Sequence, residues 1–567
     1  MEGEENLISK LSKSKAGTEV RKTLNVCLLS ATVFGFLAHS FMLFNKISWH
    51  DDFRHTFDVG ATYKSGRWAL GLLGSLVKNV FGMNISIPVI NGVVSLLFIA
   101  LSAFLIIYRF EVKQRLPQMI ITSIMICFPV VTATFGYMFT APYYFFALLT
   151  SILGGYLITE ALNVFLDGQR QKHTSGESDK NTRSFVFHEN SALIKAIINA
   201  SSGILLIALT MGIYQPYLVC AICFIFFFFF YRLMDDNTDC YLWIRTCVIS
   251  VAAVGIALVL YLLLNKIFLF LNAEEMGTYQ GLNSMTQFSI HNIKIGIIRS
   301  YNSFYFMFVN GYKGLFYLKS TQIVLLIMCL ASTTYIVLFI LKTKSLLRKF
   351  LLILLILASP LVIQLIELFS SNGSGESIVH TLMTYSLVYL FVFPLCFLQN
   401  NNIKLSGHLF SGIKILVTCC SIFFVIYFCI YNNAAYFKSW IYREQAEQFY
   451  NRLITRVESE DGYRPGMTIA LVGKFDASTY VQYRELEKIN IKNYPVNSLI
   501  NNNDPVTRNL RAFFYYYNDF PAVVMTSTES EKYGELQEVK LMSCYPSDGS
   551  IEIIDNVLVV KLSDISK

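Results

Sequence analysis

Apolar residues in this chain form long unbroken runs, not the alternation of a strand or the one-sided stripe of a soluble helix. A membrane core about 30 Å thick needs ~20 apolar residues per helix, and about eleven runs of that length are present. They lie near residues 24–45, 85–108, 118–136, 143–165, 193–211, 214–231, 246–270, 321–341, 350–369, 378–398 and 409–431. The pattern predicts an all-α polytopic membrane protein.

Composition supports the same class. Of the 567 residues, 54% are hydrophobic and 15% are charged, which excludes an ordinary soluble globule. The net charge is +8, but the basic residues are concentrated in short segments between apolar runs, as in loops that face anionic lipid. We therefore expect contact with membrane lipid and no binding of nucleic acid.

The positions of Lys and Arg set the expected orientation. When the chain is threaded through the membrane, its basic segments fall on one side, which the positive-inside rule makes cytoplasmic. These segments are the N-terminal tail 1–23 and residues 109–115, 169–183, 232–245 and 342–349. The opposite face then receives the first loop 46–84, the turn at 213–216 and a long loop at 271–320.

The C-terminal part, residues 432–567, differs sharply from the rest and is rich in Asp, Glu, Asn and Arg. An odd number of spans places it on the extracytoplasmic face. Helical periodicity at 443–457 and short apolar runs at 468–472, 522–525 and 557–562 predict a small soluble α/β domain. It contains no recognisable catalytic constellation, which leaves binding of an acceptor or shielding of a site as its expected roles.

Twelve cysteines raise the question of disulfides or metal, but almost all lie inside apolar runs. Cys220 and Cys223 form a C-x-x-C pair that leads directly into a run of phenylalanines and has no second ligand pair nearby. We interpret these cysteines as small core residues.

The first outer loop, 46–84, concentrates charged and aromatic residues at the membrane interface. The acidic pair Asp51 and Asp52 is followed by Arg54 and, further along, by Gly66-Arg67-Trp68. An acidic pair alone also fits a helix start, and tryptophan also anchors interfaces. The combination, however, exceeds what capping requires.

Glycosyl transfer from a lipid phosphate needs these same groups. A carboxylate takes the proton from the acceptor hydroxyl, and cations stabilise the phosphate as the glycosidic bond breaks. Aromatic rings stack on sugars. The loop is therefore the candidate site.

Three motifs together carry a family resemblance: Asp51-Asp52, Gly66-Arg67-Trp68 and Met211-Gly212-Ile213-Tyr214-Gln215. With them, the chain resembles the type II (Gtr) O-antigen glucosyltransferases over roughly residues 20–430. That family is similar to the GT-C membrane glycosyltransferases, whose first outer loop carries an acidic pair and whose donors are polyprenyl-phosphate sugars. The resemblance implies a GT-C-like domain at 24–431 in a bacterial plasma membrane.

The resemblance also implies residue roles. Asp51 or Asp52 would be the catalytic base, and Arg67 would bind the donor phosphate or position the loop. Tyr214 and Gln215 would line the same cavity, although on their own they fit a polar turn before the next helix. Two further expected substrate contacts are Trp68, which could equally be an interface aromatic, and Arg54, which no family motif supports.

The implied function is inverting transfer of a glucosyl or related residue from polyprenyl phosphate to a cell-surface polysaccharide. No cofactor is required, although Mg²⁺ or Mn²⁺ between an aspartate and the phosphate fits the scheme. A lipid-linked-sugar flippase or transporter, a GT-C enzyme with a protein acceptor, and a non-catalytic scaffold are the alternatives. A transporter predicts charges near the bilayer midplane, which are scarce, and a scaffold does not need so many spans.

Overall fold

The computed structural model describes residues 15–47, 51–174, 182–277, 290–369, 379–399, 407–474, 484, 514–515 and 518–564. Within these residues, nine helical runs are long and apolar enough to cross a membrane, which confirms the predicted all-α membrane class. The helices of these runs are α2 (Lys15–Leu43), α5 (Pro88–Arg109), α6 (Arg115–Cys127) with α7 (Pro129–Phe135), α8 (Ala141–Thr174), α9 (Thr182–Tyr214) with α10 (Leu218–Leu233), α11 (Cys240–Leu271), α13 (Lys319–Lys342), α14 (Leu346–Ile363) and α17 (His408–Glu458).

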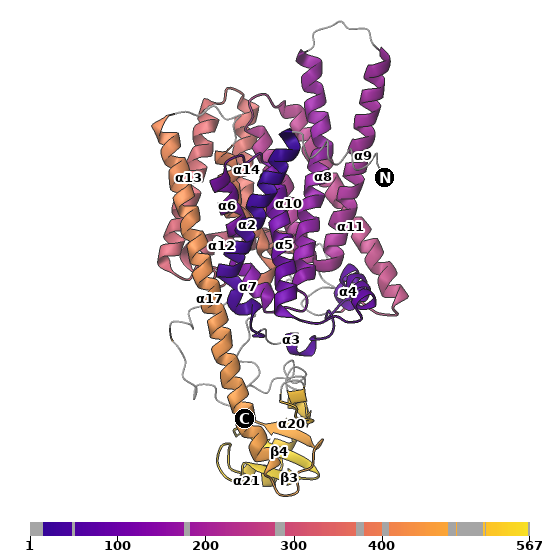
Figure 1. Cartoon of the computed structure of the whole chain (residues 1–567), viewed down its shortest axis with the longest axis vertical. Helices are drawn as coiled ribbons and strands as arrows, with labels where there is room; N and C mark the ends of the chain where they lie inside the picture. The colour runs from indigo at the N-terminus through magenta and orange to yellow at the C-terminus, as the bar shows by residue number, and fades with distance from the viewer. Residues whose placement is uncertain are drawn as a thin grey trace.

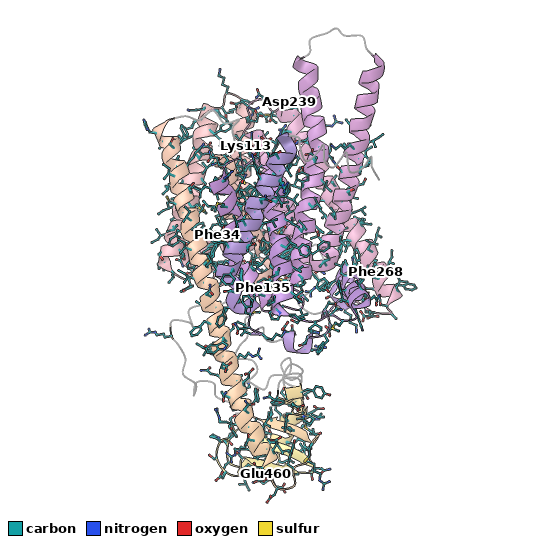
Figure 2. The ribbon with its side chains drawn as sticks, viewed as in Figure 1. Phe34, Lys113, Phe135, Asp239, Phe268 and Glu460 are labelled. Atoms are coloured by element: carbon teal, nitrogen blue, oxygen red, sulfur yellow. The ribbon has the colours of Figure 1, made fainter. Side chains whose placement is uncertain are left out.

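The two ends of the bundle carry different elements. Lys113 and Asp239 lie at one end, whereas Phe135 and Phe268 lie toward the other (Figure 2). The second end carries the short helices α3 (Asp51–Arg54) and α4 (Trp68–Phe81), and the C-terminal sheet lies beyond it (Figure 1). We call these the Lys113 end and the α4 end.

The run from α9 to α10 is a hairpin, as predicted. Tyr214 leaves the helical conformation, and the 3-10 turn η2 (Gln215–Tyr217) follows, with Pro216 inside it. At the start of this hairpin turn, Gln215 contacts the loop at the α4 end. Further along α10, the ring centre of Phe228 lies 4.2 Å from the guanidinium carbon of Arg109, which is in the last turn of α5. Helix α10 therefore runs back toward the Lys113 end.

The prediction of one long loop at residues 271–320 is wrong, because this segment contains a helix. Residues 271–320 contain α12 (Ile290–Val309), a 20-residue helix whose buried residues are Gly296, Ser300, Ser303 and Met307. Lys294 and Arg299 interrupt its apolar residues, so no continuous apolar run marks it in the sequence. Its small buried residues pack on α15 (Ile366–Phe369), and an added Cβ on Gly296 would lie 2.8 Å from the Leu368 backbone.

Two predicted spans are interrupted at the α4 end. The 350–369 span breaks at Gln364, after the helix-internal Pro360, which leaves α14 and α15 as separate pieces. The 378–398 span consists of the 3-10 turns η4 (Thr381–Met383) and η5 (Tyr385–Val388), followed by α16 (Tyr389–Leu398).

Helix α17 joins the bundle to the C-terminal sheet without a break and is 51 residues long. The sheet has strand order β2-β1-β4-β3, built from β1 (Thr468–Val472), β2 (Val523–Val524), β3 (Ile551–Ile554) and β4 (Val557–Lys561). β1 is parallel to β2 and β4, while β3 and β4 form a hairpin. The short helices α20 (Ser527–Gly534) and α21 (Gln537–Leu541) lie between β2 and β3, and the three predicted strands are confirmed.

Two hydrophobic cores lie along α17. Its first half contributes Val417, Phe424 and Phe428 to the large core of the bundle. Its last turns contribute Phe449 and Leu453 to a separate core shared with the sheet. The sheet is therefore stabilised by its own buried residues and by one face of α17.

Candidate active site

Asp52 is completely buried in the loop that joins α2 to α5. One carboxylate oxygen accepts from the Lys46 ammonium group. The other accepts from the Ser86 hydroxyl at 2.7 Å and from the Phe139 backbone amide at 3.0 Å. Because a buried charge is stable only when it is paired and hydrogen-bonded, these three partners account for a carboxylate at this depth.

Asp51 has different surroundings. It is the first residue of α3, and its side chain is half-buried. Residues 48–50, which include Trp49 of the first outer loop, lie outside the described residues. The two members of the acidic pair are thus not equivalent, since only Asp52 is fully removed from the surface.

The second and third predicted motifs lie against each other. The Gln215 side-chain amide donates to the Ser65 carbonyl at 2.7 Å across 150 positions of sequence. Tyr261, in α11, donates its hydroxyl to the Gly66 carbonyl at 3.2 Å and accepts from Gln215 at 3.3 Å. The outer loop, the η2 turn and α11 therefore meet at the Gly66-Arg67-Trp68 motif.

The glycines of both motifs are required by this close approach. Gly66 has φ +71°, and an added Cβ would lie 2.7 Å from the Tyr261 hydroxyl and 2.9 Å from the Gln215 amide nitrogen. An added Cβ on Gly212 would lie 2.5 Å from the Trp68 ring. Any side chain at either position would separate the two motifs.

Arg67 lies beside a stacked pair of aromatic rings. Its guanidinium carbon lies 5.7 Å from the ring centre of Tyr144 and 5.5 Å from that of Tyr214. These two rings stack on each other at 4.0 Å, and Arg67 donates to the Tyr144 hydroxyl at 3.0 Å. A guanidinium group held in this way keeps further N–H donors that can bind an anion.

Several buried polar atoms around this contact have no hydrogen-bond partner among the residues that the structure describes. Leaving such an atom unsatisfied costs about 1–3 kcal/mol, so a bound polar ligand or water is expected beside it. The Tyr214 and Tyr217 rings touch edge to face at 5.1 Å, and Asn265 lies one helical turn beyond Tyr261. The atoms are Arg67 Nε, Trp68 Nε1, Tyr214 Oη, Tyr217 Oη and Asn265 Oδ1.

Trp68 forms an apolar wall of the site. It is buried and stacks in parallel on Phe268 at 5.3 Å. Tyr63 also stacks on Phe268, with the ring centres 6.1 Å apart. The aromatic side chains of the loop are thus packed against the end of α11.

The acidic pair and Arg67 are linked through the start of α8. Asp52 binds the Phe139 amide, and Arg67 binds the Tyr144 hydroxyl five residues later. Asp51, Asp52, Arg67, Trp68, Tyr214 and Gln215, six of the seven predicted site residues, thus belong to one network of neighbouring segments at the α4 end.

Arg54 is the exception among the predicted residues, because it is exposed to solvent. Near it, His55 Nδ1 and Asp58 Oδ1 lie 2.6 Å apart. Partial burial of Asp58 acts to raise its pKa, but the hydrogen bonds from His55 and the Gly60 amide, together with the charges of His55 and Arg54, outweigh it and lower the pKa below its usual value. This segment is an ordered turn rather than part of the Arg67 contact.

A further polar cluster was not predicted. Glu367, in α15, is 1% exposed and accepts from the Ser303 hydroxyl at 3.1 Å and the Tyr312 hydroxyl at 3.0 Å. Tyr312 and Lys313 have φ of +28° and +53° and lie between Gly311 and Gly314, which also have positive φ. The sequence does contain a signal for this cluster, because Glu367 is an acidic residue inside the predicted span 350–369.

Lys46 and Ser86 were also missed as site residues. Both lie at the borders of apolar runs, where a lysine or a serine is ordinary. Nothing in the spacing of either residue relates it to Asp52, so contacts across the folded loop were needed to find them. Among the described residues, no group of three or more His, Cys, Asp or Glu side chains is placed to hold a metal ion.

Comparison with known proteins gives one match. The family model described as "Glucosyl transferase GtrII" matches residues 40–395. The matched region begins just before the acidic pair and includes all three motifs. No curated protein and no solved structure matches the chain.

Proposed function

Because the chain belongs to the glucosyl transferase GtrII family, and is therefore a glycosyltransferase, we propose that it moves a glucosyl residue from a polyprenyl-phosphate donor to a cell-surface polysaccharide. The reaction takes place at the extracytoplasmic face of a bacterial plasma membrane. The α4 end of the bundle is the end at which it occurs.

The proposed chemistry is a single displacement. A carboxylate of the acidic pair takes the proton from an acceptor hydroxyl, whose oxygen attacks the anomeric carbon. The bond from that carbon to the phosphate oxygen breaks, its electrons remain on the phosphate, and the configuration inverts. Arg67 stabilises the charge that develops on the phosphate. The scheme needs no cofactor; a Mg²⁺ or Mn²⁺ ion, if bound, would be held by a carboxylate of the acidic pair and would neutralise charge on the donor phosphate.

The observation that carries this proposal is the Arg67 contact. A guanidinium beside two stacked tyrosine rings, with a buried Nε that has no hydrogen-bond partner among the described residues, suits a phosphate group. The neighbouring hydroxyls of Tyr214 and Tyr217, which also lack a partner in the described part of the chain, suit the hydroxyls of a sugar. Arg67 and the acidic pair are joined through the first residues of α8, which supports one site for both.

Eleven crossings are part of the proposal. The nine apolar runs become eleven when α9 and α10 count separately and the shorter apolar helix at Tyr385–Leu398 is added. The positive-inside rule then makes the Lys113 end cytoplasmic. The C-terminal sheet becomes an extracytoplasmic domain, placed to bind acceptor polysaccharide or to shield the site.

Reconstitution tests the function. The purified protein in liposomes is supplied with undecaprenyl-phosphate glucose and surface polysaccharide, and incorporation of sugar into polymer is followed. We expect incorporation by the wild type and its loss in a folded Asp51→Asn/Asp52→Asn variant. Equal transfer by both proteins would exclude the acidic pair as the catalytic centre, and absence of transfer by the wild type would reject the donor or the acceptor.

A further inference from the structure

The acidic pair is divided between two tasks: we infer that Asp51 is the catalytic base and that Asp52, with Lys46 and Ser86, forms a buried clamp that positions it. This inference rests on the proposed function for the role of Asp51. It makes Lys46, Ser86 and Asp52 positioning residues.

The hydrogen-bonding capacity of Asp52 is directed into the protein. Its carboxylate is 0% exposed, and both oxygens receive donors, one from Lys46 and the other from Ser86 and Phe139. A base must reach the proton that it removes, either directly or through one water. For Asp52 to do so, the clamp would have to open and leave Lys46 without its partner.

Lys46 is equally committed. Besides Asp52, its ammonium group donates to the Ser86 carbonyl at 3.0 Å and to the Ser86 hydroxyl at 2.9 Å. An ammonium group has three N–H donors, and these contacts use all three. Lys46 therefore serves the pair with Asp52 and has no donor left for a phosphate.

The clamp joins three segments that are distant in sequence. Lys46 follows the end of α2, Ser86 precedes α5, and Phe139 lies in the turn before α8. The Ser86 amide also donates to the Thr56 carbonyl at 2.8 Å, and the Thr56 hydroxyl donates to the Asp52 carbonyl at 2.9 Å. These contacts fix the loop on both sides of α3.

Asp51 is the group that this fixation would position. It immediately precedes Asp52 in α3, where successive side chains point in different directions, so anchoring Asp52 inward orients its neighbour along another direction. Its half-buried side chain keeps access to the surface. In the transfer, Asp51 takes the acceptor proton as the acceptor oxygen bonds to the anomeric carbon and the electrons of the broken bond remain on the phosphate. Asp51 later returns that proton to water.

A charge-compensation experiment tests the division. The variants Asp51→Asn, Asp52→Asn, Lys46→Met, Lys46→Arg and Lys46→Met/Asp52→Asn are reconstituted, and kcat and donor KM are measured per folded molecule. Asp239→Asn is the matched control, because this aspartate caps α11 at the opposite end of the bundle, and asparagine caps equally well.

We expect Asp51→Asn to lower kcat by about 10²–10⁴-fold, the usual contribution of a general base, with little change in donor KM. Lys46→Met leaves a buried carboxylate unpaired and should lower kcat by about tenfold or more, whereas the double variant removes both charges and should recover most of that loss. Lys46→Arg, which keeps the cation, should retain more activity than Lys46→Met.

The opposite pattern overturns the inference. If Asp52→Asn and the double variant are as inactive as Asp51→Asn, or if Asp51→Asn stays active, then Asp52 takes part in the chemistry. If kcat per folded molecule is unchanged in Lys46→Met, the clamp does not position the base. If the wild type itself transfers no glucose, the proposed function fails, and thermal unfolding of the same variants still tests the clamp. Loss of stability in Lys46→Met without recovery in the double variant would then reject it.

Discussion

At the scale of single residues, the planar shape of Arg67 is as important as its charge. The guanidinium group lies beside two stacked tyrosine rings and donates to the hydroxyl of one of them, an arrangement of planar group and directed donors that an ammonium group does not reproduce. We predict that Arg67→Lys raises the donor KM by about tenfold or more, although the charge is retained. The measurement is donor KM in liposomes.

Tyr144→Phe is the matched control for this prediction. It keeps the ring beside the guanidinium and removes only one hydroxyl acceptor, so its effect should be a few-fold at most. Equal donor KM for Arg67→Lys and the wild type would mean that Arg67 acts through its charge alone.

Gly212 and Trp68 form a second residue-scale pair. The Cβ added by Gly212→Ala would lie 2.5–2.9 Å from three atoms of the Trp68 indole, so the ring must shift from its stacked position on Phe268. We predict destabilisation of about 1–3 kcal/mol, the usual cost of overpacking. Trp68→Phe removes the outer part of the indole, so the double variant should be more stable than the sum of the single changes indicates.

The comparison is a double-mutant cycle of unfolding free energies in detergent. Strict additivity of the two substitutions would contradict direct packing between the two motifs.

Residue chemistry explains which site residues the sequence could predict. Asp51, Asp52 and Arg67 were predictable because charges at a membrane interface are conspicuous among apolar residues. The hydrogen bond from Gln215 to the Ser65 carbonyl brings the second and third motifs into contact. Lys46 and Ser86 were not predictable, since their role depends on a loop that brings together positions separated by 40 residues. Arg54 carries the same charge as Arg67, but it is exposed whereas Arg67 is half-buried, and this difference is not visible in the sequence.

At the scale of elements, the turn between α3 and η1 (Tyr63–Ser65) should respond to acid. Asp58 accepts from His55 and from the Gly60 amide, and its pKa is lowered. A lowered carboxyl pKa contributes stability that is fully present above about pH 4, the usual value, and is lost as the pH falls through the lowered pKa. We predict that protection of the Gly60 amide against hydrogen exchange decreases below about pH 4.

Asp58→Asn supplies the comparison for the acid response. The Gly60 amide of this variant should exchange faster than that of the wild type at neutral pH. Because the variant lacks the carboxyl group, the protection of this amide should not decrease further in acid. An identical pH dependence in both proteins would assign the response to another group.

A buried histidine joins helix α2 to α6 and α17. The Ile126 carbonyl can only accept, so His39 donates from Nε2 at 2.9 Å, and its Nδ1 accepts from the Tyr436 hydroxyl at 2.7 Å. Thr132 donates to the same hydroxyl at 3.1 Å. We predict that Tyr436→Phe lowers the free energy of unfolding by about 1–3 kcal/mol, because it leaves a buried acceptor and a buried donor without this partner.

Tyr442→Phe is the control on the same helix. Tyr442 is half-buried, and its contact with Lys438 uses the ring, which phenylalanine retains. Equal stability of the Tyr436→Phe and Tyr442→Phe proteins would indicate that the His39 contact adds nothing to helix packing.

The elements that the sequence predicted well are those whose apolar surface is continuous. The runs around α5, α8 and α11 are visible because lipid and protein both favour apolar side chains on every face. Helix α12 was missed because its polar residues interrupt the pattern. The separation of α15 from α14 depends on Gln364 and on contacts with Ser300 and Tyr312, which no local pattern contains.

At the scale of the whole molecule, the continuity of α17 connects the two hydrophobic cores. The same helix supplies Tyr436 to the contact with His39 and Phe449 to the core of the sheet. A continuous helix transmits orientation, so the C-terminal sheet is held at the α4 end by α17 itself. This arrangement supports a role for the sheet near the site rather than as a freely mobile appendage.

The sidedness of the molecule yields the last prediction. Lys113 is exposed at one end of the bundle, and Asp548, in the C-terminal sheet region, is fully exposed beyond the other. With the proposed orientation, a membrane-impermeant maleimide should label Asp548→Cys in sealed right-side-out vesicles and should label Lys113→Cys only after permeabilisation. The parent protein measures background from the native cysteines, most of which are at least partly buried. The reverse pattern would place the acidic pair and Arg67 on the cytoplasmic side, and the acceptor would then have to be a cytoplasmic molecule. Labelling of both variants in sealed vesicles would contradict an odd number of crossings between the two positions.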